Sequence, residues 1–105
     1  MRRGEIWWAN MAAPMGRRPV VLVTRDGAYR ARSSVTVALI TRTVRNIPVE
    51  VPVGSESGLK YFGAVNADEL STIPKSLLGP HIGALPDDKM EAVDRALHFA
   101  LGLKD

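Results

Sequence analysis

The 105-residue sequence contains no cysteine, which excludes disulfide bonds, zinc–thiolate sites and thiolate nucleophiles. No apolar run approaches the roughly 20 residues that cross a bilayer. The start, MRRGEIWW, has a basic pair but no apolar stretch of signal-peptide length. We therefore expect a cytoplasmic protein that does not enter a membrane. Glycine-rich phosphate loops are missing too, because neither GxGxxG nor GxxxxGK occurs.

Metal-binding and carboxylate patterns are equally scarce. The two histidines, His81 and His98, fall in different predicted elements and have no neighbour at ligand spacing, so neither a metal site nor a cofactor is predicted. His81 follows Gly79-Pro80, where a turn is expected, and each histidine is more often structural than catalytic. In each of two pairs of adjacent acidic residues, the two side chains are expected to point in different directions, so neither pair makes a glycosidase-type pair of carboxylates. These pairs are Asp68-Glu69 and Asp87-Asp88.

The charges that are present are unevenly distributed. Residues 1–45 hold nine arginines against two acidic residues, a net charge of +7, whereas the remainder has a net charge of −4. The planar guanidinium of arginine binds phosphate oxygens in pairs and stacks on nucleobases. This half of the chain therefore favours a polyanionic partner such as nucleic acid. A merely solvated arginine face is the alternative explanation.

Length and turn residues indicate a single β-rich domain over residues 1–105. At this length one core is already hard to fill, and nine glycines and seven prolines favour short strands joined by turns. Strands are predicted over 4–9, 19–24, 35–41, 47–53, 63–67, 71–73 and 81–85, with loops over 10–18 and 54–58 and one helical turn over 75–78. Prolines make 47–53 an edge or bulged strand. Alternation places Ile6 with Trp8 and turns Trp7 outward.

The last segment has helical periodicity. Five apolar side chains form one stripe, Asp87 and Asp88 lie at the positive end of the helix dipole, and Gly102 ends the helix. The stripe consists of Met90, Val93, Leu97, Ala100 and Leu101. A small barrel needs a cover for its open face, so we expect this stripe to pack on the sheet. The predicted fold is mainly β: a small SH3-like barrel of strongly bent antiparallel sheet with a C-terminal α-helix.

Two residues stand out as candidates for chemistry on a polyanion. Arg18 precedes Pro19, and a residue before proline is restricted to extended geometry, so its guanidinium starts from a stiff point. Thr41 ends a predicted strand, where its hydroxyl could reach a phosphate oxygen. The alternative is that Thr41 was selected only for its strand propensity, and that Arg17 and Arg18 are a solvated pair.

Six sequence blocks, which follow one another in order and span nearly the whole chain, resemble the MazF/PemK-type toxins. They are RGEIWWA (3–9), RRPVVLV (17–23), VTVALIT (35–41), VNADELSTIPKSLLG (65–79), IGAL (82–85) and VDRALHFALGL (93–103). The resemblance implies the barrel-plus-helix fold that these toxins share with the gyrase poison CcdB, and a homodimer. It also implies a cognate antitoxin, whose disordered, partly acidic tail would suit the arginine-rich half.

By the same resemblance, Arg18 and Thr41 carry catalysis. The implied activity is metal-independent, sequence-specific cleavage of single-stranded RNA, in which the RNA's own 2′-hydroxyl attacks and leaves a 2′,3′-cyclic phosphate and a 5′-hydroxyl. Seven further residues are predicted to contact the RNA: Arg17, Arg25, Arg30, Arg32, Trp7, Asp68 and Glu69. For Trp7 a dimer contact or plain packing is the alternative. For Arg25, Arg30 and Arg32 the alternative is that they are solvated charges.

The chain departs from the family pattern in two places. The loop before Arg18 is short and lacks the Ser, Glu and Gln of many members. Glu69 and Ser71 stand where many members have Gln and Arg, so a different base preference is expected. Two alternative functions remain: a non-catalytic toxin that binds a protein such as gyrase, and a non-catalytic nucleic-acid-binding barrel. CcdB acts through a tryptophan-bearing C-terminus, whereas this chain ends Leu103-Lys104-Asp105.

Overall fold

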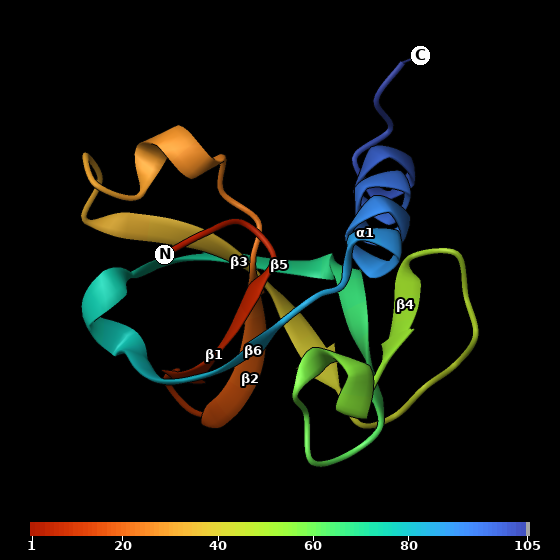
Figure 1. Ribbon diagram of the computed structural model, residues 1–105, viewed down its shortest axis with the longest axis horizontal. Coiled ribbons are helices and arrows are strands. Elements are labelled where there is room, and N and C mark those ends of the chain that lie inside the picture. The colour runs from red at the N-terminus through yellow and green to blue at the C-terminus, as the bar shows by residue number, and fades with distance from the viewer. Residues whose placement is uncertain (105) are drawn as a thin grey trace.

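One curled antiparallel sheet and one helix make up the fold (Figure 1). The computed structural model describes residues 1–104. Its sheet has the strand order β4-β5-β3-β2-β1-β6. The strands are β1 (Glu5–Asn10), β2 (Arg17–Leu22), β3 (Ser34–Thr41), β4 (Glu50–Val53), β5 (Gly63–Pro74) and β6 (Leu78–Ala84), and the helix is α1 (Asp87–Ala100). One-turn helices lie at Asp26–Ala28, Ser55–Ser57 and Lys75–Leu77. Within residues 1–104 no helix has the length and apolar character needed to span a bilayer.

The sheet curls because its longest strand contains a bulge. β5 pairs with β3 from Thr41↔Ala64 to Leu39↔Asn66, and the next pair is Ala38↔Leu70. Residues 67–69 of β5 therefore have no partner in β3, and such an insertion bends a strand. The first half of β5 also pairs with β4, while its second half continues beside β3 on the curled side of the sheet (Figure 1). The predicted bent sheet with a C-terminal helix is confirmed.

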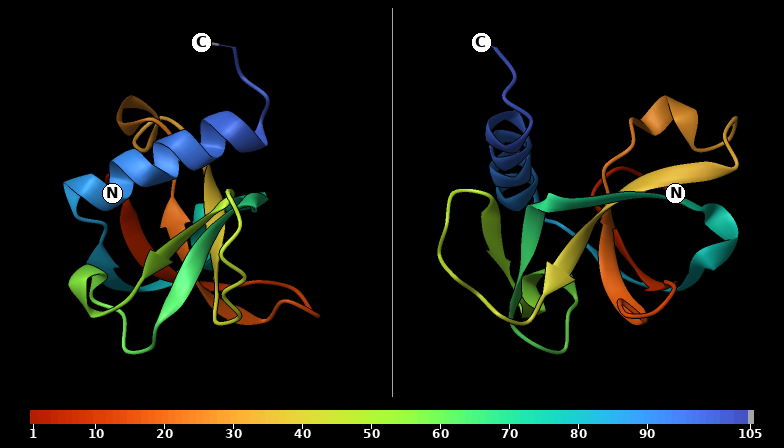
Figure 2. Two further views of the ribbon diagram at one scale, coloured as in Figure 1. Left: turned by 90° about the vertical axis from the view of Figure 1, so that its right-hand side faces the viewer. Right: turned by 180° about the vertical axis from the view of Figure 1, so that it is seen from behind.

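Both faces of the sheet bury apolar side chains. On one face Val21 and Val53 pack with Val93 of α1, which lies across the sheet (Figure 2). On the other face Val20 and Leu22 pack inside the curl, together with a second set of buried residues. Each of these five side chains has no exposed surface, and burying such a side chain stabilises the fold by about 1.5–3 kcal/mol. Successive residues of β2 thus serve two cores.

Several predicted boundaries and orientations need correction. The two pieces predicted at 63–67 and 71–73 are one bulged strand, β5. β2 begins at Arg17, because β1 pairs with the backbone of both arginines. His81 lies within β6 rather than in a turn. The helical stripe packs on the sheet as predicted except for Leu101, which is 56% exposed. Trp7 does not face outward: it packs against the core inside the curl.

Candidate functional site

Antiparallel pairing brings Arg18 and Thr41 to the same end of the sheet. β2 and β3 pair as Val20↔Leu39, Val21↔Ala38 and Leu22↔Val37. Continuing this register beyond Val20 puts Arg18 opposite Thr41, and opposed residues of antiparallel strands lie on the same face. Both residues are half-buried and line one groove of about 650 Å³. The structure therefore joins the two residues that the sequence predicted to act together.

The groove is basic and is formed by five separate parts of the chain. β1, β2, the end of β3, the segment 58–63 and β6 each contribute to its wall. Four of its lining residues are cationic, namely Arg17, Arg18, Arg42 and Lys60. None of the lining residues within the described chain is acidic, although the sequence holds 11 acidic residues. Close grouping of like charges on a concave surface attracts a polyanion.

The hydroxyl of Thr41 is held in place by the turn that follows β3. The backbone N–H of Thr43 donates to Thr41 Oγ1 at 3.1 Å, and the only acceptor for the hydroxyl among the described contacts is Thr43 O at a long 3.4 Å. Local bonds of this kind fix a hydroxyl at a chain reversal. The Thr41 O–H can therefore donate to a ligand oxygen in the groove without breaking a short internal bond.

Glycines fix the segment that forms the opposite wall. A Cβ on Gly63 would collide with the backbone carbonyl of Thr41, and a Cβ on Gly83 would collide with that of Ser57. Gly58 has φ +88°, a left-handed conformation that favours glycine. These close contacts tie residues 57–63 to β3 on one side and to β6 on the other. The wall is thus packed against the sheet at both ends.

Two arginine–aromatic stacks flank the catalytic candidates. The guanidinium carbon of Arg17 lies 4.1 Å from the ring centroid of Trp8, and that of Arg42 lies 4.3 Å from the ring centroid of Tyr61. A cation over an aromatic face gains electrostatic energy and loses freedom. The stacks hold the positive charges of Arg17 and Arg42, which line the groove together with Arg18, in preferred positions.

Trp7 does not line the groove but contacts His81, which does. Its ring stacks on His81, with ring centroids 4.9 Å apart, and its Nε1 donates to Glu5 Oε1 at 3.1 Å. Burial alone would raise the pKa of Glu5, but the bonds from Trp7 and from the backbone N–H of Arg2, with nearby His81, lower that pKa below its usual value. The carboxylate therefore stays charged and orients Trp7, on which the groove residue His81 rests.

The other predicted RNA contacts lie away from this groove. Arg25 and Arg32 line a second hollow of about 460 Å³ beside the C-terminal half of α1, and Arg30 is exposed in the adjoining loop. Asp68 and Glu69 are exposed on the bulge of β5. Their contact with RNA stays a prediction.

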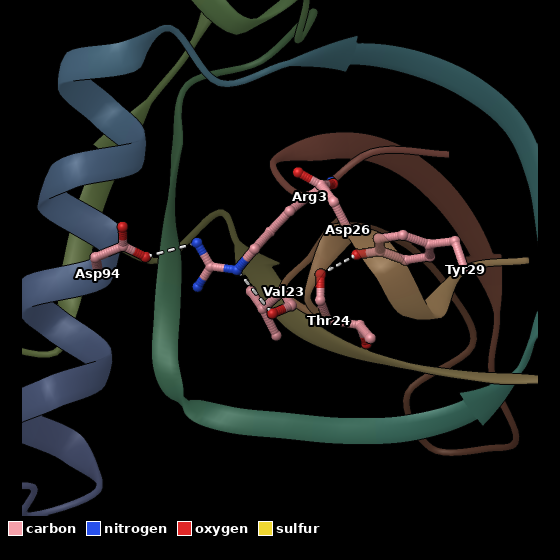
Figure 3. Close-up of polar contacts among 6 residues, drawn as sticks. All are labelled: Arg3, Val23, Thr24, Asp26, Tyr29 and Asp94. Carbon is pink, nitrogen blue, oxygen red and sulfur yellow. Dashed lines mark hydrogen bonds and ion pairs between the residues drawn. The ribbon is translucent and has the colours of Figure 1, made fainter. Parts of the chain in front are cut away.

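Arg3 at the second hollow is already engaged within the protein. Its guanidinium donates to the carbonyl of Val23 at 2.9 Å and pairs with Asp94 of α1 at 2.7 Å (Figure 3). This contact connects the N-terminal segment to the helix, as Figure 3 shows. Nearby, the hydroxyl of Tyr29 donates to the carbonyl of Thr24 at 2.7 Å (Figure 3). Much of the polar surface here thus has a structural role.

Sequence reasoning missed several residues of the groove. Trp8, Arg42, Tyr61, Phe62 and His81 line it, yet their spacing in the sequence shows no common pattern. Only their positions at strand ends and beside glycines could have indicated a shared site. Within residues 1–104, no three His, Asp or Glu side chains are grouped so that they could hold a metal ion. The groove instead offers fixed cations, a hydroxyl donor and exposed aromatic rings.

Comparison with known proteins agrees with this fold. The family described as PemK-like, MazF-like toxin of type II toxin-antitoxin system matches residues 2–101. The probable endoribonuclease MazF5 of Mycobacterium tuberculosis is 38% identical over 101 residues, which cover 94% of this chain and 91% of the relative. The endoribonuclease MazF3 of the same species is 40% identical over 82% of this chain and 84% of its own length.

Solved structures give the same result. The Mycobacterium tuberculosis toxin MazF-mt6 superimposes with a TM-score of 0.89 at 36% identity, covering 96% of this chain and 99% of that one. A mycobacterial endoribonuclease in complex with its cognate antitoxin gives a TM-score of 0.90 at 30% identity, covering 100% and 98%. The chain belongs to the family of PemK-like, MazF-like toxins of type II toxin-antitoxin systems.

Proposed function

We propose that this protein is a metal-independent endoribonuclease toxin that cleaves single-stranded RNA at specific sequences. Relatives named as endoribonucleases are 38% and 40% identical over most of the chain. The observation that carries the proposal is the shared groove of Arg18 and Thr41, which is open, basic and free of acidic lining among the described residues. Such a groove suits a phosphodiester backbone.

The proposed reaction needs no nucleophile from the protein. The 2′-oxygen of the RNA attacks the adjacent phosphorus, the P–O5′ bond breaks, and the products are a 2′,3′-cyclic phosphate and a 5′-hydroxyl. One proton leaves the 2′-hydroxyl and one is gained by the 5′-oxygen. The protein must align the attack in line and stabilise the charge that builds on the phosphoryl oxygens.

Arg18 and Thr41 divide this work. The guanidinium of Arg18 stabilises the phosphorane charge, and it is held by extended backbone within β2, where Ala9 of β1 is its paired residue. Thr41 donates its O–H to a phosphoryl oxygen, since the Thr43 N–H already fixes its oxygen. Because an arginine side chain keeps its proton in proteins, it serves as a charge and a donor rather than as the base.

The proposal includes a protein partner and a second copy of the chain. A homologous endoribonuclease has been solved with its cognate antitoxin, and a partly acidic tail would complement the groove cations. For the homodimer, three apolar side chains near the end of α1 are exposed by 56–63% and offer a surface to cover: Phe99, Leu101 and Leu103. We place this single-domain toxin, residues 1–105, in the cytoplasm, where RNA and antitoxin occur.

The test is to incubate the protein with a long, unstructured RNA in excess EDTA and to map the ends of the fragments. We expect cleavage with 2′,3′-cyclic phosphate and 5′-hydroxyl ends. Arg18→Ala should reduce the rate by at least about 10²–10³-fold with little change in thermal midpoint, because the side chain is only half-buried. Arg95→Ala, an exposed arginine on α1, is the matched control. An active Arg18→Ala protein, or cleavage that disappears in EDTA, would contradict the mechanism.

A further inference from the structure

Two large aromatic side chains are exposed at the rim of the groove. Tyr61 is 55% exposed and Phe62 is 64% exposed, and both line the groove together with Arg18 and Thr41. Exposed aromatic rings beside a functional cleft mark a contact surface, because a ring left in water gains nothing for the fold. Both rings therefore lie at a surface that a ligand in the groove can reach.

Phe62 is the ring that remains accessible. The face of Tyr61 is covered by Arg42, whose guanidinium carbon is 4.3 Å from the ring centroid, with Lys60 Nζ at 5.6 Å. The cations described over aromatic rings in residues 1–104 lie on Trp8 and Tyr61. Phe62 instead lies beside Gly54, where an added Cβ would be 3.7 Å from the ring.

The backbone under Phe62 is held on both sides. Leu59 is buried in the core beneath α1, and its N–H donates to the carbonyl of Gly54 at 3.2 Å. On the other side Gly63 touches the backbone of Thr41 so closely that no Cβ fits. Phe62 is therefore next in sequence to Gly63, which contacts the catalytic candidate Thr41. Because the backbone on both sides of Phe62 is already fixed, it loses little conformational entropy when a ligand binds.

We propose that Phe62 is a base-stacking residue, which receives an unpaired nucleobase of the RNA next to the cleaved phosphate. This inference rests on the proposed ribonuclease function. Single-stranded nucleic acid is bound by cations that follow the backbone and by aromatic rings that stack on bases. The groove supplies both within one wall: Arg42 and Lys60 for phosphates and Phe62 for a base. A purely apolar protein segment would gain little from so many flanking cations.

The test compares Phe62→Ala with Phe62→Leu and uses a chemical change in the RNA. The probe is a short, fluorescently labelled RNA that is 2′-O-methylated, so that it binds without being cut. Its sequence is that of a mapped cleavage site. If no such site is found, a homopolymer of each base is used instead. A series of probes carries one abasic nucleotide at successive positions. Binding is measured by anisotropy, and cleavage is measured on the matching unmodified RNA.

We expect Phe62→Ala to bind the intact probe about 5- to 150-fold more weakly, the range for losing one aromatic–base stack. One abasic position should weaken binding to the wild type by a similar factor and should have almost no effect on Phe62→Ala. Phe62→Leu should resemble Phe62→Ala, whereas Phe62→Trp should bind normally. Ile47→Ala is the matched control, since Ile47 is a 39% exposed apolar residue that does not line the groove.

Two results would overturn the proposal. If Phe62→Leu restores binding, the residue provides only apolar contact, as for a protein partner or a dimer. If each abasic change weakens binding to Phe62→Ala as much as it weakens binding to the wild type, no base stacks on this ring. Failure of the ribonuclease function would be visible separately, as a wild-type protein that leaves RNA intact while the binding measurements still decide the role of Phe62.

Discussion

Replacing Thr41 by valine separates its structural bond from its proposed chemical one. Valine keeps the shape and strand preference of threonine but removes the oxygen that accepts the Thr43 N–H at 3.1 Å. Thr41 is half-buried and Thr43 is exposed, so water can replace that bond and the loss is about 0.5–1.5 kcal/mol. Such a loss would lower the thermal midpoint by a few degrees, about 4–8 °C per kcal/mol in a domain of this size.

The catalytic loss should be far larger than this. A domain with an unfolding free energy of about 5–15 kcal/mol stays essentially fully folded after a change of that size. Removing one donor to a developing oxyanion costs about 10²–10³ in rate, or roughly 2.7–4 kcal/mol. We therefore expect kcat/KM for Thr41→Val to fall by that factor at a temperature well below the midpoint. Thr41→Ser, which keeps the hydroxyl, should stay within about 10-fold of the wild type on the same scale.

The assay is initial-rate cleavage of a short RNA that spans a mapped cut site, with thermal unfolding of each variant in the same buffer. Loss of less than about 10-fold in Thr41→Val would mean that the hydroxyl does not act on the transition state. Equal losses in the serine and valine variants would mean that loss of the hydroxyl does not explain the effect, because the serine variant keeps it. Either result would refute the reasoning from the Thr43 contact.

The remaining predictions concern the groove wall and the curled end of the sheet. Gly63→Ala should lower the free energy of unfolding by about 1–3 kcal/mol or more and should also slow RNA cleavage, because the new Cβ collides with the Thr41 carbonyl. In the control Gly27→Ala the new Cβ meets nothing within 4 Å, so the thermal midpoint should stay nearly unchanged. Equal midpoints for the two variants would contradict the close contact. Burial, with the Asp26 carboxylate nearby, raises the pKa of Tyr29 to about 12. The pKa of Tyr29 in the folded state is above its unfolded value of about 10, so the contribution of Tyr29 to the free energy of unfolding is complete below pH 10 and is lost as the pH rises towards 12. Tyr29→Phe should therefore flatten that part of a curve of stability against pH. An unchanged slope would disprove the burial argument.

The sequence predicted most elements of the fold because their signals are local. β3 was predicted over 35–41 and spans Ser34–Thr41, and the helix follows its apolar spacing and its first-turn aspartates. β2 was predicted too short, since pairing with β1 extends it over Arg17 and Arg18, which no apolar pattern marks. The edge strand β4, which pairs with β5, was predicted too long. It begins only at Glu50, whose Oε1 accepts the N–H groups of Arg45 and Asn46, so the chain is still turning before this residue.

The site was less predictable because it depends on contacts between distant segments. Arg18 and Thr41 were identified from a resemblance and from a proline, but only the register of β2 with β3 brings them together. Alternation in β1 gave the wrong orientation for Trp7, because a sheet that buries apolar residues on both faces has no plain outside. Phe62 has no signal in the sequence beyond its aromatic character, since its exposure depends on how the segment around it packs.

The position of β6 in the sheet has a consequence for the timing of activity during synthesis. This strand supplies His81 and Ile82 to the groove and is the penultimate element, yet it pairs with β1 at the start of the chain. A growing polypeptide that has not yet released residue 84 from the ribosome therefore lacks one side of the cleft. The groove is complete only when β6 has paired with β1, so we expect no RNA cleavage from a nascent chain that ends before residue 84.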